Sequence, residues 1–408
     1  MTAFFFEILL MFKNRNIFIT SFTFFLVVLS WFTWFPILPL HLRDLGANDV
    51  QVGITYALMG LAFSLFQVIG GIMSDRWGRK NIIVWPSYTF IVFYVLCGLA
   101  KDWMMLTFLL VISDSFSAIQ MPSFSALTAE SVPEEKRGLA FGMIWMGLGF
   151  GITVGPAIGA IALKYVGINM LFYFTAAIFV ACSVLRHVFL TETHTTTSSF
   201  SFKGITSSIS RQYLLFLGAG ILFAITFNLT QWGPFITLFA KDVQKFDPSK
   251  IQLLFTASGI AAIFSSLVGG KLVDRFGPLK LMATGAILHC IIILVWTFSR
   301  SYLASILFFS MFRICFQVAF ISYETLINLL SPMERRGTLV GIAGSLNGAI
   351  GATGPVIGSE LKLAYGPAAP FYGALAFALA CSVALGIIKK HPVEKAEAEP
   401  AITTHIPK

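Results

Sequence analysis

Two ionisable residues lie inside long apolar stretches of the sequence. Asp114 lies within residues 103–130 and Arg313 within residues 301–330, and each stretch is long enough to cross a membrane. An ionisable group at that depth is costly unless it faces a polar cavity or a partner, so it indicates a functional site. A carboxylate there can take up and release a proton, and an arginine can bind an anionic group.

The alternative for this pair is a static salt bridge that holds two parts of the protein together. Glu324 follows Arg313 by eleven residues, which is about three helical turns and roughly 16 Å along the same helix face, too far for a direct ion pair. We interpret Glu324 as a second carboxylate on the same path. Other polar candidates, which could contact a solute or only bond to neighbouring helices, are Gln120, Asn228, Gln231 and Gln317.

Charged residues also gather in a glycine-containing loop with the pattern G-x-x-x-D-R-x-G-R-K. Glycine allows the chain to turn tightly at a membrane surface, and a carboxylate is stabilised near a helix N-terminus. The alternative to a functional loop is that its charges only fix the orientation of the chain in the membrane. The loop comprises Gly71, Asp75, Arg76, Gly78, Arg79 and Lys80, and a degenerate copy contains Gly270, Asp274, Arg275 and Gly277.

Small residues form a third pattern within residues 138–163. Glycines recur every four positions there and form one bare stripe on which another helix can approach closely. Pro156 removes a backbone hydrogen bond and permits a kink. The alternative is ordinary helix packing with no further function. The pattern comprises Gly142, Gly151, Gly155, Pro156 and Gly159, with Gly147 on the same stripe.

Other kinds of chemistry find no support in the sequence. It contains neither a phosphate-binding GxxxxGK[ST] loop nor an HExxH pattern. The five cysteines all fall in apolar stretches without the spacing of zinc ligands, and we interpret them as core residues. We therefore expect no catalytic residues, no metal ion and no cofactor, and we do not expect an enzyme.

The elements that must position these residues are membrane-spanning helices. The chain of 408 residues is 57% hydrophobic and only 12% charged, far more apolar than a soluble domain. Together with 103–130 and 301–330, ten stretches free of Asp, Glu, Lys and Arg predict an all-α membrane protein with twelve transmembrane helices. These ten are 16–42, 49–74, 81–100, 138–163, 165–185, 212–240, 251–270, 281–299, 337–359 and 363–388.

The basic residues explain the net charge of +9. Most of the Lys and Arg fall on one side of the membrane when the spans are threaded from a cytoplasmic N-terminus, which is the positive-inside bias. We therefore predict a multi-pass protein of the cell membrane with both termini cytoplasmic. Its partner is the lipid bilayer, and nucleic acid is not needed to explain the charge.

The second half of the chain repeats the first at an offset of 199 residues. Asp75 and Arg76 match Asp274 and Arg275, and Asp114 matches Arg313. Each half contains six spans, an even number, so both halves begin on the same side of the membrane and the repeat is parallel. The predicted organisation is an N-terminal six-helix bundle (1–190), a cytoplasmic linker (191–211), a C-terminal six-helix bundle (212–390) and a disordered cytoplasmic tail (391–408).

The loop from Gly71 to Lys80 resembles the signature loop between helices 2 and 3 of the major facilitator superfamily. The small-residue pattern is similar to the motif of its twelve-helix drug and proton antiporters, although Ala160 stands where that motif ends in glycine. The resemblance covers both halves. It implies two pseudo-symmetric bundles, the major facilitator fold, whose helices 1, 4, 7 and 10 line a central cavity.

The resemblance also implies roles for individual residues. Asp114 and Arg313 face each other across the cavity, and Trp34 and Trp232, each beside a matching proline, form its walls. In the loop, Asp75 lies near the start of helix 11 and Arg79 reaches a carboxylate at the cytoplasmic end of helix 4, for which Glu130 is the candidate. Those antiporters usually carry an arginine in helix 4, so Asp114 is a departure.

Three functions remain open. The first is a secondary active transporter that works by alternating access as a proton-coupled antiporter, exports a small organic or amphipathic solute and is functional as a monomer. In it, Asp114 and Glu324 exchange the proton, because burial favours the neutral form of a carboxylate. The second is an importer or uniporter of an anionic metabolite held by Arg313. The third is a non-transporting membrane sensor or a lipid-moving protein.

Overall fold

Helices account for nearly all of the computed structural model, which describes residues 13–193, 210–331 and 336–388. Eleven of its helical segments are long and apolar enough to cross a membrane. A twelfth, α11 (Pro248–Phe276), passes the same test when its two parts, which meet at an angle of 53°, are taken together. The prediction of an all-helical protein with twelve spans is confirmed. The predicted tail, 391–408, lies outside the described residues.

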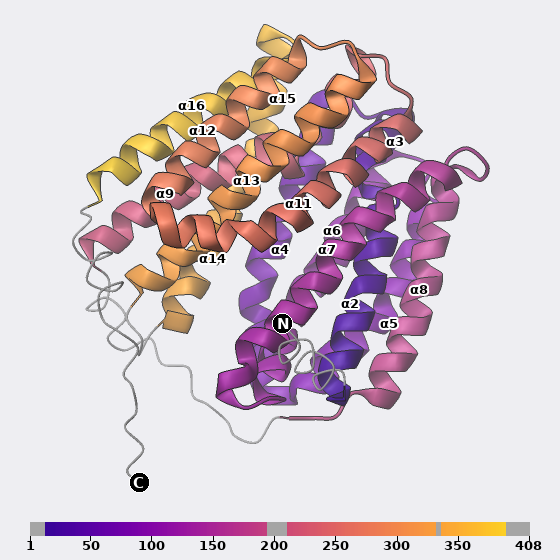
Figure 1. Ribbon diagram of the computed structural model, residues 1–408. Coiled ribbons are helices and arrows are strands. Elements are labelled where there is room, and N and C mark those ends of the chain that lie inside the picture. The colour runs from indigo at the N-terminus through magenta and orange to yellow at the C-terminus, as the bar shows by residue number, and fades with distance from the viewer. Residues whose placement is uncertain (1–12, 194–209, 332–335, 389–408) are drawn as a thin grey trace.

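The helices form two bundles that follow each other along the chain (Figure 1). The first contains α2 (Arg15–Phe32), η1 (Phe35–Ile37), α3 (Leu38–Asp44), α4 (Asp49–Trp77), α5 (Arg79–Gly98), α6 (Trp103–Glu130), η2 (Glu134–Lys136), α7 (Arg137–Ala162) and α8 (Gly167–Phe189). The second contains α9 (Arg211–Phe227), η4 (Asn228–Trp232), α10 (Phe235–Asp242), α11, α12 (Pro278–Thr297), α13 (Tyr302–Leu330), α14 (Arg336–Gly351), α15 (Gly354–Tyr365) and α16 (Ala369–Ile387).

Both bundles pack their helices in the same order. In the first, α2 packs on α7, α4 on α6 and α5 on α8; in the second, the equivalent pairs are α9 with α14, α11 with α13 and α12 with α16. Between the bundles, α7 packs on α11, and α4 packs on α14 and α15. The repeat in the sequence is therefore a repeat in the packing.

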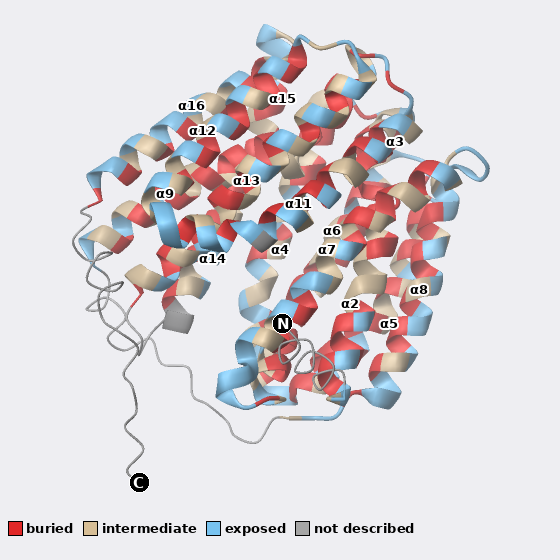
Figure 2. Ribbon diagram, in the orientation of Figure 1, coloured by how far each residue is buried: buried red, intermediate tan, exposed pale blue. Residues whose placement is uncertain are grey.

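The outer helices present apolar side chains to their surroundings. Val180, Val184 and Val188 form an exposed stripe on α8, since residues four apart share a helix face. Exposed stretches run along the outer helices (Figure 2). Exposed apolar stripes on helices of this length are typical of surfaces that face lipid.

Several helices differ from the predicted spans in their bounds, and two of them continue through a charged residue that is buried. The sixth span was predicted to end at residue 185, but α8 continues to Phe189 and carries Arg186 inside the bundle. The eleventh was predicted to end at residue 359, but α15 continues to Tyr365 and includes Lys362. Both side chains are almost fully buried beside polar partners, so a charge did not mark the end of the helix.

Candidate functional site

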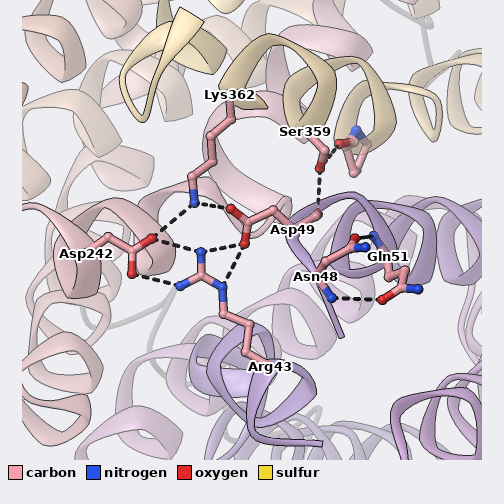
Figure 3. A network of polar contacts seen from close by, with 8 residues as sticks. Arg43, Asn48, Asp49, Gln51, Asp242, Ser359 and Lys362 are labelled. Carbon is pink, nitrogen blue, oxygen red and sulfur yellow. Dashed lines mark hydrogen bonds and ion pairs between the residues drawn. The ribbon is translucent and has the colours of Figure 1, made fainter. Parts of the chain in front are cut away.

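Four charged residues join the two bundles at one end of the molecule, here named the Arg43 end (Figure 3). Arg43 of α3 donates hydrogen bonds of 2.7 Å and 2.8 Å to Asp242 of α10, and one of 2.7 Å to Asp49 of α4. Lys362 Nζ of α15 lies 2.8 Å from Asp49 Oδ2 and 3.1 Å from Asp242 Oδ2. Each cation contacts both carboxylates, and each bundle supplies one cation and one carboxylate.

The sequence analysis did not single out this network. Its residues lie at helix ends, where charges normally face water, so they resembled ordinary interfacial residues. A usable signal was present: Arg43 and Asp242 are separated by 199 residues, the offset of the repeat. Opposite charges at equivalent positions of two parallel repeats can meet across the axis that relates them.

Further contacts tie the bundles together at the same end. Thr237 donates a hydrogen bond of 2.6 Å to the carbonyl of Pro36, and Ser359 Oγ donates one of 3.0 Å to the carbonyl of Asp49. Gln252 Nε2 lies 2.5 Å from the carbonyl oxygen of Thr33, its acceptor. The hydrogen bonds that join the bundles between described residues lie at the Arg43 end, which is therefore closed.

The charged loop lies at the opposite end, here named the Asp75 end. Arg79 donates hydrogen bonds of 2.6 Å to Asp75 Oδ1 and 2.9 Å to Ser74 Oγ, and its Nη2 lies 3.2 Å from Glu130 Oε1. The expected contact between Arg79 and Glu130 is thus present. These partners all belong to the N-terminal bundle. The expected position of Asp75 near the start of helix 11, at Arg336 and Gly337, is not tested, because the side chains of these two residues are not described.

Glu192, at the beginning of the linker, contacts the charged loop. Its two carboxylate oxygens accept hydrogen bonds of 2.9 Å and 3.1 Å from the backbone N–H groups of Arg79 and Lys80. This is the favourable place for a carboxylate, because the first N–H groups of a helix have no partner within it. Gly78 ends α4 with a φ of +86°, and a Cβ there would lie 2.5 Å from Glu192 Oε2. The positive φ of the turn favours Gly78, and a Cβ there would also displace the Glu192 carboxylate from its two backbone N–H donors.

The remaining residues of the two loops make fewer contacts. The guanidinium groups of Arg76 and Arg275 lie over the rings of Trp77 and Phe276 at 5.9 Å and 5.3 Å. Asp274 is exposed. Gly71 lies inside α4 and not in a turn, contrary to the expectation for a glycine of this loop. Its neighbour Gly70 makes a close helix contact, because a Cβ there would overlap the backbone of Ile119, whereas one at Gly71 would only touch Pro122.

Asp114 and Arg313 occupy equivalent places in the two bundles. Each is the twelfth residue of its helix, α6 or α13, and each side chain is half-buried. The ion pairs between described residues include neither of them. The static salt bridge considered for this pair is therefore absent from this conformation.

Arg313 instead bonds within its own bundle. Its Nη1 donates a 2.5 Å hydrogen bond to Gln231 Oε1. Gln231 belongs to η4, a π-helical turn that interrupts the helix begun by α9. The same turn is held by His289, whose Nε2 lies 2.8 Å from Thr230 Oγ1. A π-turn inside a helix is rare and often marks a functional site.

The two tryptophans predicted as cavity walls differ in position. Trp232 lies between the bundles, with its ring 5.3 Å from that of Trp31 and 4.9 Å from that of Phe35. Trp34 was predicted wrongly: it is fully buried in the N-terminal bundle, where its Nε1 donates a 3.2 Å hydrogen bond to Thr175. The π-turn before Trp232 has no counterpart before Trp34, so matching positions point in different directions.

Gln120 is also placed differently from the predicted path. Its Nε2 donates hydrogen bonds of 2.8 Å to the carbonyl of Ile83 and 3.0 Å to Ser87 Oγ, inside the N-terminal bundle. Ser87 in turn accepts a 2.8 Å hydrogen bond from the buried Arg186, which the sequence analysis missed. A buried polar group needs such partners, so Gln120 holds helices together and does not line the path.

The other polar candidates divide into two groups. Asn228 is buried, donates a 2.9 Å hydrogen bond to the carbonyl of Ala224 and packs against Gly351 and Gly354, so it also has a packing role. Gln317 is half-buried and Glu324 is exposed, both on α13. These two remain accessible to a solute or a proton, whereas Asn228 does not.

The glycine stripe of α7 packs on α2. A Cβ at Gly151 would lie 2.9 Å from Leu29 N, and one at Gly155 would lie 2.8 Å from Phe32 Cβ. Gly159 reaches Thr33 and Gln252, so the stripe ends at the contact between the bundles. Pro156 is buried within the continuous helix α7, whereas Gly142 has open space around it. The predicted close approach of another helix is present.

Comparison with known proteins extends these observations. The model of the Major Facilitator Superfamily matches residues 20–245 and 221–407. The quinolone resistance protein NorA of Staphylococcus aureus is 25% identical over 389 residues, which cover 93% of this chain and 97% of that protein. A homologue of the multidrug resistance efflux pump PmrA from Lactococcus lactis is 26% identical and covers 85% of this chain and 88% of its own length.

Solved structures have the same fold. The nucleoside transporter NupG superposes with a TM-score of 0.79 at 12% identity, covering 91% of this chain and 99% of its own. An inward-facing bacterial homologue of the human lysosomal transporter Spinster superposes with a TM-score of 0.70 at 15% identity. The match covers 95% of this chain and 97% of that protein.

The fold and the matches along the whole length of the chain define a multi-pass membrane transporter that moves small-molecule solutes. The chain belongs to the Major Facilitator Superfamily, as its two loops and its repeated bundles had indicated. Its similarity to multidrug efflux proteins agrees with the resemblance to the drug and proton antiporters.

Proposed function

We propose that this transporter is a proton-coupled antiporter that exports a small organic or amphipathic solute by alternating access. The observation that carries the proposal is Asp114, a carboxylate near the middle of the 28-residue helix α6 with no ion-pair partner among the described residues. Such a group can be neutral in one conformation and charged in another, which is what proton coupling requires. The similarity to efflux proteins supports the direction of transport.

In the proposed cycle the Asp75 end faces the cytoplasm and the Arg43 end faces outward. The described conformation, closed at the Arg43 end, is then the inward-facing state. A solute that binds from the cytoplasm displaces the proton of Asp114, which leaves through the Asp75 end past Glu324. Opening of the Arg43 end breaks the ring of Arg43, Asp49, Asp242 and Lys362, the solute leaves, and Asp114 takes a proton from outside.

The charged loops would control the opposite end of the same cycle. Arg79, Asp75, Glu130 and Glu192 form a hydrogen-bonded cluster in the N-terminal bundle, and the copy with Asp274 and Arg275 lies at the matching place in the other bundle. We propose that these clusters meet the facing bundle when the Asp75 end closes. The transporter would complete this cycle as a monomer.

The coupling between solute binding and proton release can be tested by adding solute to detergent-purified protein and measuring the protons released. In weakly buffered solution, a panel of cationic, neutral and anionic compounds is screened with wild-type protein and with Asp114→Asn. We expect at least one compound to release protons from the wild type, and that release to be lost in Asp114→Asn, because an amide carries no exchangeable proton of this kind. Equal release from both proteins would contradict the role of Asp114.

A further inference from the structure

Two buried N–H donors, one on Arg313 and one on Gln231, have no acceptor among the described residues. Gln231 Oε1 accepts the 2.5 Å hydrogen bond from Arg313 Nη1. This fixes the orientation of the amide, because arginine carries only donors and would not face an NH2 group. The Nε2 group of Gln231 and the Nε of Arg313 are then both buried without an acceptor among the described residues.

Unused donors of this kind are unusual in a folded protein. Most buried polar atoms have a hydrogen-bond partner, since a buried donor without one has lost its water and gained nothing. Here the two donors belong to a bonded pair of side chains, so they lie in the same neighbourhood. Together they provide N–H groups for acceptor oxygens that the described residues do not supply.

The charge of the site selects the kind of oxygen. Arg313 takes part in none of the ion pairs between described residues, so none of the described carboxylates neutralises its positive charge. A cation inside a membrane protein is stabilised by an anion far more than by a neutral acceptor. The arrangement therefore favours a carboxylate over an alcohol or an amide.

Aromatic rings lead away from this charge towards the other bundle. The Arg313 guanidinium lies 5.5 Å from the ring centre of Phe316, which is 5.4 Å from Phe227. Phe227 lies 6.1 Å from Trp232, and Trp232 lies 5.3 Å from Trp31 of the N-terminal bundle. Rings at these separations attract one another and attract a flat aromatic group placed among them.

We propose that Arg313 and Gln231 bind the carboxylate of an aromatic organic acid whose ring system lies along Phe316, Phe227 and Trp232. This inference specifies the substrate class of the proposed transporter, and it rests on that proposed function. A carboxylate bound there accepts hydrogen bonds from the guanidinium and from Gln231 Nε2. Because the aromatic row ends on Trp31, the bound acid contacts both bundles and its binding depends on their relative position.

Isothermal titration calorimetry on full-length protein in detergent tests this site. The probes are 1-naphthoate and 1-naphthylmethanol, which share a ring system and differ in charge, each corrected for partition into protein-free micelles. The variants are Arg313→Gln, Arg313→Lys and Gln231→Leu. Lys271→Gln is the matched control, since it removes an exposed cation on α11 that has no part in the proposed site. Thermal unfolding identifies any variant that is not folded.

We expect the wild type and Lys271→Gln to bind 1-naphthoate more tightly than 1-naphthylmethanol. Arg313→Gln should weaken naphthoate binding by about tenfold or more and Gln231→Leu by about threefold or more, because they remove a charged and a neutral donor respectively. Arg313→Lys should lie between the wild type and Arg313→Gln, since lysine keeps the charge but lacks the fork of donors. Binding of 1-naphthylmethanol should change less than twofold.

Two results would overturn the proposal. One is the absence of naphthoate binding to folded wild-type protein, which would mean that the two donors serve only bound water. The other is equal naphthoate binding by the wild type and Arg313→Gln. The measurement is made at fixed pH without a gradient, so naphthoate binding that releases no proton would sustain this site while contradicting the antiport mechanism.

Discussion

Two arginines inside the helices have neutral partners, yet their surroundings differ. Arg186 donates hydrogen bonds of 3.0 Å to Thr23 and 2.8 Å to Ser87, and its guanidinium lies 4.9 Å from the ring centre of Phe124. Arg313 has one hydrogen bond and a buried Nε without an acceptor. The first arrangement is a satisfied packing contact, whereas the second is the place where we propose a binding site. The two arginines differ in whether their buried N–H donors have acceptors, and not only in how deeply they are buried.

Gly78 and Gly277 provide a matched pair at the scale of single residues. Both end a helix with positive φ, +86° and +81°, so alanine should cost about 1 kcal/mol at either position. Only at Gly78 would the new Cβ also collide with Glu192, whereas Gly277 has open space. We expect Gly78→Ala to lower the thermal unfolding temperature of the purified protein more than Gly277→Ala.

Equal losses from the two glycine variants would show that the contact between Glu192 and the start of α5 does not hold the loop together. A larger loss for Gly277→Ala would contradict the account of this loop. Glu192→Gln provides an independent control, because it keeps the shape of the side chain and removes the charge at the helix N-terminus.

At the scale of elements, the glycine stripe sets how closely α7 approaches α2. Gly155→Leu would insert a side chain where the stripe touches the backbone of Leu29 and the side chain of Phe32. Gly142→Leu on the same helix would meet open space. Overpacking in such a contact costs about 1–3 kcal/mol, so we expect Gly155→Leu to reduce the yield and thermal stability of the protein, with Gly142→Leu close to wild type. Comparable stability of both variants would contradict the packing role of the stripe.

The sequence predicted these elements better than it predicted where their side chains point. Apolar stretches with few or no charges located the helices, because a membrane span of about 20 residues tolerates few charges. Trp34 was misplaced because the π-turn at Asn228–Trp232, which no local pattern signals, has no counterpart before Trp34, so the two matching tryptophans are not in equivalent surroundings. Gln120 was misplaced because composition does not distinguish a side chain between helices of one bundle from one between the bundles.

At the scale of the whole molecule, the Arg43 end and the Asp75 end differ in what holds them. The Arg43 end is closed by a ring of two cations and two carboxylates that joins the bundles. At the Asp75 end, Arg79 bonds within the N-terminal bundle. Alternating access requires that one end opens as the other closes, with the two bundles moving against each other. The ring is then the contact that must break for the outer side to open.

Spin-label distances across both ends test this central claim most directly. One label pair replaces the exposed Trp77 and Phe276 at the ends of α4 and α11, and the other replaces the exposed Tyr165 and Tyr365 at the Arg43 end. Protein in nanodiscs is measured at high and at low pH by pulsed electron spin resonance. The double variant Arg43→Met with Lys362→Met is the control that removes both cations of the ring.

We predict that acidification, which protonates Asp114, changes the two distances in opposite directions, so that the Tyr165–Tyr365 pair approaches as the Trp77–Phe276 pair separates. The variant without the two cations should show the separated Tyr165–Tyr365 distance more often at every pH. Asp114→Asn should no longer respond to pH. Distances that stay constant, or that change in the same direction at both ends, would contradict proton-driven alternating access in this protein.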